Sequence, residues 1–396
     1  MAILFVMALS WHARIYGQEI SDTLNLHKNR NLTVSLITCY PGEEIYELCG
    51  HSAIRVRGEG IDSVWNYGIF DFSQPNFVYR FVKGETDYKG ASYPFRWFLP
   101  EYVKAGRKVV EQDINFTPQE AERMLEILRE SVLPENATYR YNYVKDNCST
   151  RILNHVDSAS EVVILYPDTI RYGTFRKEME AYHEGYPWYQ FGIDLALGSG
   201  LDVPINSREE MFVPVELERN AESAHFADGR KFIKETRVLN EGKEDATLPP
   251  TPWWAAPVLW AWILTAILIL GSVYDIYRTR ITYPVYDAWF FMLGLAGCLI
   301  FFLVFISVHE ATTPNVLIFW LNPLQFIFVL GLSIRKLRIA ADFMAWYNII
   351  AVGLLLVLSP FYTQRLNAAF YPLMLSTFIM ASGYAIIRAK KGYKYR

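Results

Sequence analysis

The chain divides into two parts by the pattern of its hydrophobic positions. Over residues 18–250, short stretches of alternating apolar and polar residues predict a globular head that is rich in aromatic side chains. Over residues 251–396, apolar runs of roughly 20 residues, the length that crosses a bilayer core, predict an all-α membrane domain. Five transmembrane helices are expected there, at 253–273, 287–308, 314–334, 340–360 and 367–387.

Three strands are predicted near the start of the head. Residues 32–38 alternate apolar and polar positions and include several β-branched side chains, and two similar runs follow at 52–57 and 63–67. If these two runs pair as a hairpin, residues at the start of the first and near the end of the second approach each other. His51 and Asn66 occupy such positions.

Two helices of the head are located by their first residues. Residues 117–120, Thr-Pro-Gln-Glu, form a capping box with proline at the first helical position, and an apolar helical stripe follows. Asn147 is a favourable N-cap for a second helix with apolar residues along one side. Cys148 then falls in the first turn of that second helix.

The charges of the loops between the spans predict the orientation in the membrane. Lys and Arg follow the first, third and fifth spans, whereas the loops after the second and fourth contain only Arg365. Basic loops stay in the cytoplasm, so the C-terminus is expected there and, with an odd number of spans, the head outside. Residues 1–17 carry a short apolar run without a basic start. They are expected to be a partial signal peptide rather than a buried or disordered start, which agrees with export.

Composition and spacing exclude several classes of function. The net charge of -3 and the pI near 6.2 provide no basic surplus for binding nucleic acid. His155, His183 and His225 are scattered without the paired spacing of metal sites. The sequence also contains no phosphate-binding loop and no Gly-X-Ser-X-Gly elbow. No metal or other cofactor is therefore expected.

Cys148 is the candidate nucleophile. The unpaired amides and the dipole at the start of a helix favour a thiolate over a thiol. The thiolate would attack a carbonyl carbon, and the backbone amides around Cys148 and Ser149, supported by Asn147, would hold the resulting oxyanion. The alternative is that Cys148 is simply a small buried residue, as many cysteines are.

His51 is the candidate general base, and later general acid, for this thiol. A third group is needed to fix the tautomer of the imidazole, and Asn66 is the leading candidate with Asp71 as its rival. The alternative for His51 is a histidine that serves only the turn in which it lies.

The head contains two further cysteines, Cys39 and Cys49, ten positions apart around a Pro-Gly turn. In an oxidising compartment they can pair, which would leave Cys148 as the free thiol of the head. Cys49 is the alternative nucleophile, but it lacks a helix start. Cys298 lies inside the second predicted span, where a packing role is expected.

Several motifs resemble the Bacteroides-type lipoprotein N-acyltransferases (Lnb). In the tail the resemblance rests on His309, Asn315 and the Leu-Asn-Pro-Leu run around Asn322. These three residues are expected to contact lipid or substrate. The alternative for His309 is a solvated loop residue. In the head it covers 36–42, 50–56 with its Gly-His-Ser, 66–72, 146–151 with its Asn-Cys-Ser-Thr, and 191–198.

The resemblance implies a fold and an activity. The order of histidine before cysteine is similar to that of the circularly permuted papain-like (NlpC-like) proteins, which implies an α+β head followed by five transmembrane helices. It implies a protein of the bacterial inner membrane with its head in the periplasm. The implied reaction moves an acyl chain from a membrane phospholipid, through a thioester on Cys148, to the N-terminal cysteine amine of a lipoprotein.

Two other classes of function fit the same residues. One is a membrane-anchored cysteine hydrolase, either a peptidoglycan amidase or a phospholipase, in which water replaces the amine. The other is a noncatalytic membrane-anchored binding or assembly module, in which Cys148 is structural and can be replaced without loss of function.

Overall fold

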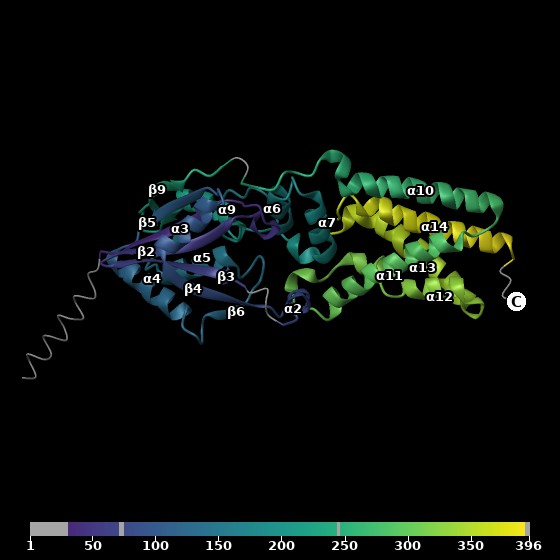
Figure 1. Ribbon diagram of the computed structural model, residues 1–396, viewed down its shortest axis with the longest axis horizontal. Coiled ribbons are helices and arrows are strands. Elements are labelled where there is room, and N and C mark those ends of the chain that lie inside the picture. The colour runs from purple at the N-terminus through teal and green to yellow at the C-terminus, as the bar shows by residue number, and fades with distance from the viewer. Residues whose placement is uncertain (1–30, 71–74, 244–245, 393–396) are drawn as a thin grey trace, which may run out of the picture. The chain divides into compact units, whose positions relative to one another are not determined.

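The computed structural model describes residues 31–70, 75–243 and 246–392, which form two compact units (Figure 1). Within the described part of the chain, the first unit contains the residues up to 70 together with 87–170 and 206–248, and the second contains 75–86, 171–205 and 249–392. Two segments of the predicted head, 75–86 and 171–205, therefore belong to the same compact unit as the membrane-spanning helices.

An antiparallel sheet forms the centre of the first unit, and the three strands predicted at 32–38, 52–57 and 63–67 are confirmed as neighbours within it. A separate two-stranded sheet joins β7 (Ile164–Leu165) and β8 (His225–Phe226). The main sheet has the order β6 (Thr138–Arg140), β4 (Asp87–Pro94), β3 (Ile61–Ile69), β2 (His51–Gly58), β1 (Thr33–Cys39), β5 (Val109–Ile114) and β9 (Ile233–Asn240).

Helices cover both faces of this sheet. Successive strand residues point to opposite faces, so Ile54 joins the core shared with the helices of one face and Ala53 joins the core shared with the helix of the other. Both residues are fully buried. The first face carries α4 (Pro118–Ser131), α5 (Cys148–Ala159) and α9 (Pro214–Ser223), the second carries α3 (Phe95–Lys104), and η1 (Ile45–Glu47) and α8 (Ser207–Glu210) lie in connections.

The two predicted helix starts are confirmed. Thr117 caps α4 through the Glu120 N–H, and the Glu120 side chain in turn accepts from the Thr117 N–H. Asn147 caps α5 by accepting from the N–H groups of Ser149 and Thr150. The apolar side of α5 is fully buried in the core of the first unit, which fixes the position of its first residue, Cys148.

Four described helices of the second unit are long and apolar enough to cross a membrane, and they correspond to four of the predicted spans. Thr265 donates to the Pro372 carbonyl at 2.8 Å near the starts of α10 and α14, and Lys390 donates to the Ile276 carbonyl at 3.5 Å near their ends, so these two helices run in the same direction. The Arg388–Asp342 ion pair at 2.9 Å joins the end of α14 to the start of α13. The four long helices are α10 (Pro257–Arg278), α11 (Tyr283–Phe305), α13 (Arg338–Leu358) and α14 (Phe370–Lys390). The shorter elements of the second unit are α2 (Phe77–Lys83), α6 (Phe175–Tyr182), α7 (Pro187–Ala196), η2 (Ser199–Leu201), η3 (Trp253–Ala255), η4 (Glu310–Thr312), η6 (Arg335–Leu337) and η7 (Ser359–Phe361).

The segment predicted as the third span, 314–334, is not one continuous helix. It forms η5 (Val316–Phe319) and then α12 (Gln325–Ser333), because Pro323 has no backbone N–H to continue a helix. Asn322 fills the break by donating to the Ile318 carbonyl at 3.1 Å and to the Tyr347 hydroxyl at 3.2 Å. Irregular backbone at membrane depth needs such protein partners, since lipid offers none.

Two segments from the head region are fastened to the connections between spanning helices. His309 donates from Nε2 to the Phe81 carbonyl at 2.8 Å, and the Val308 N–H donates to the Lys83 carbonyl at 2.9 Å, so the last turn of α2 has partners in the loop after α11 (Figure 1). In the other segment, Asp194 of α7 accepts from the Asn367 side chain at 2.8 Å. These bonds explain why both segments belong to the second unit.

Candidate active site

The β2–β3 hairpin brings His51 and Asn66 together. Ala53 lies directly opposite Asn66, which places His51, two residues earlier, on the diagonal of that pair. The distance from His51 Nε2 to Asn66 Oδ1 is 2.5 Å. Asn66 donates from Nδ2 to the Tyr93 hydroxyl at 2.9 Å, which turns its oxygen toward the imidazole. His51 therefore carries its proton on Nε2 in the neutral form, and Nδ1 is left for the thiol.

Helix α5 supplies the third member, Cys148, at its first residue. The thiol is buried, with 8 % of the residue exposed, and is hydrogen-bonded to the His51 imidazole. The Ser52 N–H and the Ser149 hydroxyl also hydrogen-bond to the sulfur, and the hydroxyls of Ser52 and Ser149 lie 2.9 Å apart. Since Ser52 follows His51 in β2, one strand end contributes both an imidazole and an amide to the thiol.

The charges of Cys148 and His51 stabilise each other. Burial alone raises the pKa of the Cys148 thiol, but the His51 charge and the three hydrogen bonds outweigh it, so the pKa lies below its ordinary value. For His51, burial lowers the pKa, and the Cys148 charge together with bonds to Cys148 and Asn66 raises it above its ordinary value. Both shifts are in the direction of a thiolate beside an imidazolium, the reactive form of a cysteine nucleophile.

The amide predicted to bind an oxyanion at Ser149 already has a partner. The N–H groups of Ser149 and Thr150 both donate to Asn147 Oδ1 at 2.9 Å. Asn147 is itself fixed, because its Nδ2 donates to the Tyr143 and Phe212 carbonyls at 2.9 Å each. The Cys148 N–H, at the first position of the helix, has no acceptor within the helix. Ser149 and Asn147 hold this turn through their bonds to each other and to the rest of the first unit.

Gly68 forms a part of the site that sequence reasoning missed. The pairing of β3 with β4 is irregular between Asn66 and Ile69, and Gly68 has a positive φ of 88°. A Cβ at this position would lie 3.9 Å from the Cβ of Cys148 and 3.6 Å from the Tyr141 ring. The signal was present, because a glycine inside a strand pattern often marks a bulge or a close backbone approach.

The remaining cysteines differ from Cys148 in their surroundings, although Cys39 lies directly opposite His51 in the pairing of β1 with β2. All four cysteines are free thiols in the structure, so the suggested pairing of Cys39 with Cys49 is not formed. Cys39 is fully buried, and burial raises the pKa of its thiol far above the ordinary value. Cys49 lies 3.8 Å from the Tyr143 hydroxyl. Cys298 is exposed on α11.

The other predicted site residues are placed as follows. Asp71, the rival to Asn66, lies outside the described residues. His309 binds the Phe81 carbonyl, Asn315 donates to the Leu195 carbonyl at 3.1 Å, and Asn322 fills the break before α12, so each has a structural role within the second unit. Among the residues that the structure describes, no group of His, Cys, Asp and Glu side chains has the arrangement of a metal site.

These observations define the class of protein. It is an integral membrane protein whose α/β unit aligns a buried thiol at the start of a helix with an imidazole and a side-chain amide from two neighbouring strands. The comparisons with known families are more specific. One family model, the Lnb N-terminal periplasmic domain, matches residues 22–175, and another, the Lnb transmembrane domain, matches 250–392.

The chain therefore belongs to the Lnb family, as its motifs predicted. No curated protein and no solved structure matches it. Membership implies a lipoprotein N-acyltransferase-like role, and a periplasmic domain joined to a transmembrane domain indicates an inner-membrane protein with a periplasmic head.

Proposed function

We propose that this protein transfers an acyl chain from a membrane phospholipid to the N-terminal cysteine amine of a lipoprotein, with Cys148 as the acyl carrier. The observation that carries the proposal is the alignment of Cys148, His51 and Asn66 within the part of the chain that matches the Lnb periplasmic domain. A thiolate–imidazolium pair at a helix start is suited to acyl transfer through a covalent intermediate.

In the first half of the reaction, the Cys148 thiolate attacks the ester carbonyl of the phospholipid. A carbon–sulfur bond forms, and the Cys148 N–H stabilises the negative charge that develops on the carbonyl oxygen. The carbon–oxygen bond of the ester then breaks, and the departing lysophospholipid oxygen takes the proton of the His51 imidazolium. An acyl thioester and a neutral imidazole remain.

In the second half, the neutral amine of the lipoprotein attacks the thioester carbonyl. A carbon–nitrogen bond forms, the carbon–sulfur bond breaks, and the proton released by the nitrogen passes to His51. The thiolate and imidazolium are restored, and the product is an amide. Because an ordinary α-amino group has a pKa of about 7.7–8.0, a useful fraction of the acceptor is uncharged near neutral pH.

The proposed fold of the catalytic unit is a circularly permuted papain-like one. It is supported by the order of the site residues along the chain, with His51 and Asn66 on neighbouring strands before Cys148 at the start of α5. It is also supported by the pairing of the imidazole with both a thiol and a side-chain amide.

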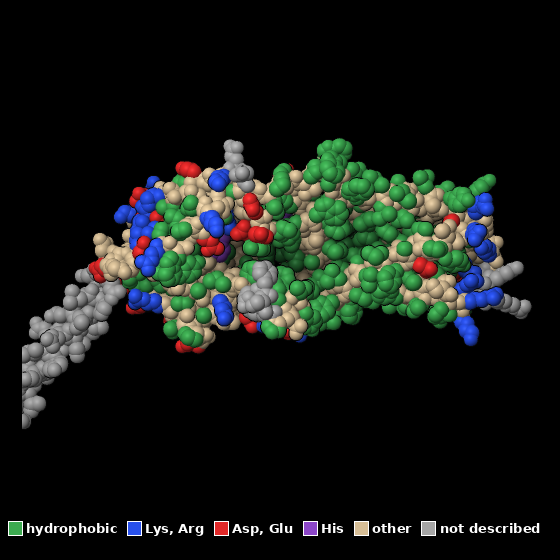
Figure 2. Space-filling view, viewed as in Figure 1, with side chains coloured by type: hydrophobic (Ala, Val, Ile, Leu, Met, Phe, Trp, Pro, Cys, Tyr) green, Lys and Arg blue, Asp and Glu red, His purple; other side chains and the backbone are tan. Residues whose placement is uncertain are grey.

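The proposed orientation has five crossings and a cytoplasmic C-terminus, with η5 and α12 together making the third crossing. It is supported by the Lys and Arg side chains at the end of the second unit where α10 and α14 finish, seen in Figure 2. An impermeant maleimide should label Glu310→Cys but not Lys391→Cys in intact cells, in a Cys49→Ala, Cys148→Ala background. Labelling of Lys391→Cys would overturn this orientation.

The activity is tested by expression in bacteria that lack their own lipoprotein N-acyltransferase, with mass spectrometry of a lipoprotein N-terminus. With the unaltered protein or with Cys49→Ala, the lipoprotein N-terminus should gain the mass of one amide-linked acyl chain. With Cys148→Ala it should gain none. N-acylation by Cys148→Ala would remove the thioester from the mechanism. Release of free fatty acid without any N-acylated product would instead identify a hydrolase.

A further inference from the structure

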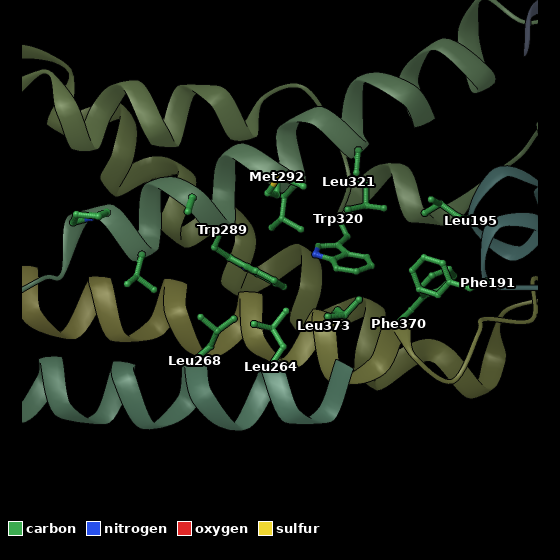
Figure 3. Close-up of a pocket in the computed structure, with 15 residues that line it drawn as sticks. Phe191, Leu195, Leu264, Leu268, Trp289, Met292, Trp320, Leu321, Phe370 and Leu373 are labelled. Carbon is green, nitrogen blue, oxygen red and sulfur yellow. The ribbon is translucent and has the colours of Figure 1, made fainter. Parts of the chain in front are cut away.

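An apolar pocket of about 650 Å³ lies within the second unit, between α10, α11 and α14 (Figure 3). Its volume falls in the range of about 300–1,000 Å³ that is usual for ligand sites. The labelled side chains of Leu264, Trp289 and Leu373 point into it from the three helices, and Phe191 and Leu195 of α7 line the end at which α14 begins. No charged side chain lines the pocket.

The two tryptophans of the pocket are held so that only their rings face it. Trp289 and Trp320 both donate their indole N–H to the Thr377 hydroxyl, at 3.2 and 3.0 Å. The polar atom of each indole is thereby turned to a protein partner, and aromatic surface remains for the occupant. A phosphate or another charged group has no partner inside the pocket, whereas a hydrocarbon chain needs none.

The pocket is elongated along the spanning helices. Its lining runs along α11 from Pro284 to Ala296, which corresponds to about 18 Å at 1.5 Å per helical residue. The lining continues to Phe370 at the start of α14, which runs opposite to α11. The pocket is therefore longer than one leaflet, which is half of a hydrocarbon core of about 30 Å. The rim is open to the lipid side, because Met292 on α11 remains 60 % exposed and Leu264 on α10 is also exposed.

We propose that this pocket is a binding site for one acyl chain of a membrane phospholipid, and that this phospholipid is the acyl donor. The second part rests on the proposed function, while the first does not. Lipid tails are as apolar as the pocket, so the site gains little from the hydrophobic effect and selects its occupant by shape and packing. The phospholipid is favoured over other occupants because the pocket is elongated, has no charged side chain in its lining and opens to the surrounding lipid.

Binding can be measured without catalysis by photolabelling. Full-length Cys148→Ala protein in phosphatidylethanolamine–phosphatidylglycerol vesicles is irradiated with a phosphatidylethanolamine that carries a diazirine in one acyl chain, and labelled peptides are mapped. The label should concentrate on Met292 and its pocket neighbours. Filling the pocket by Ala296→Phe or Ala288→Phe should reduce it several-fold, whereas Ala266→Phe, on the exposed side of α10 away from the pocket, should leave it unchanged.

The outcomes separate the two parts of the proposal. Equal labelling of Met292 and of the exposed Leu270 outside the pocket would overturn the binding site. Displacement of the label by a synthetic diacylated lipopeptide would assign the pocket to the acceptor and overturn the donor role. In the active protein, Ala296→Phe should shift the transferred chains to shorter ones and Ala266→Phe should not. If the pocket of Cys148→Ala is not labelled although the active protein N-acylates, the binding site alone is disproved. If the pocket is labelled although the active protein does not N-acylate, the proposed function alone is disproved.

Discussion

Asn66 holds His51 by a bond of 2.5 Å from Nε2 to Oδ1, and Tyr93 holds Asn66 by a bond of 2.9 Å from Nδ2 to the hydroxyl. The amide is thus fixed on both sides, and the imidazole tautomer follows from it. Nδ1 of His51 can serve the thiol only while this chain of two bonds persists.

Tyr93→Phe should weaken this chain without touching the thiol. One hydrogen bond contributes about 1 kcal/mol net, so the rate of Cys148 alkylation by iodoacetamide should fall by about fivefold, and Asn66→Ala should reduce it further. Tyr40→Phe, which removes a tyrosine bond to Glu218 on another part of the first unit, is the matched control. An equal loss in Tyr93→Phe and Tyr40→Phe would show that the effect is one of general stability.

His51→Ala should raise the pKa of the Cys148 thiol. In the folded protein the His51 charge and the hydrogen bonds outweigh burial, and without His51 only the bonds from Ser52 and Ser149 oppose it. The pH profile of alkylation should therefore move to higher pH, which is measured on a Cys49→Ala background. Cys39 should not react in either protein, because it is fully buried and its pKa is raised by that burial. An unchanged profile would mean that His51 does not set the charge of the thiol.

Gly68→Ala should slow the reaction of Cys148 with bulky reagents. Two effects are expected, a strained backbone at a positive φ and a new Cβ against Cys148 and Tyr141. Gly60→Ala isolates the first, because Gly60 has a φ of 82° and nothing within 4 Å of its added Cβ. Strain should lower the free energy of unfolding of both variants by about 1–2 kcal/mol, which appears as a lower midpoint of thermal unfolding. Only Gly68→Ala should change the alkylation rate.

His155 should make the first unit less stable as the pH falls below neutral. Burial lowers the pKa of His155 to about 4, with a smaller effect of Arg151. The unfolded chain takes up the proton near pH 6.5 and the folded one only near pH 4, so stability is complete above pH 6.5 and is lost between these values. The loss amounts to at most about 3 kcal/mol.

Thermal unfolding of the full-length protein, followed across that pH range, measures this effect. His155→Gln should reduce the fall of the unfolding midpoint between pH 6.5 and 4, and His225→Gln, at an exposed position, should not. Parallel pH profiles for the unaltered protein and His155→Gln would contradict the assignment.

Local signals were sufficient for the elements that carry the site. The alternation in 52–57 and 63–67 predicted the hairpin that places His51 diagonal to Asn66, and the asparagine before Cys148 predicted the start of α5. Four of the predicted spans also correspond to helices of sufficient length. Each of these features depends on neighbours in sequence, so a single chain is enough to reveal them.

Other features depend on partners that are distant in sequence. The bond from Asn66 to Tyr93 and the approach of Gly68 to Cys148 follow from how separate elements pack. The break in the third predicted span was hidden because a proline within an apolar run still has the hydropathy of a span. Tyr347, one partner of Asn322 at this break, comes from α13, and no local pattern identifies that contact.

The sequence by itself determined a strand hairpin with a histidine and an asparagine, a cysteine at a helix start, the membrane-spanning part of the chain and the Lnb family. Only the tertiary structure decided that Asn66 binds the imidazole, that α2 and α7 belong with the spanning helices, and that an apolar pocket opens among those helices. The physical reason is that periodicity and capping are local, whereas a cavity or a hydrogen-bond network exists only when distant segments pack together.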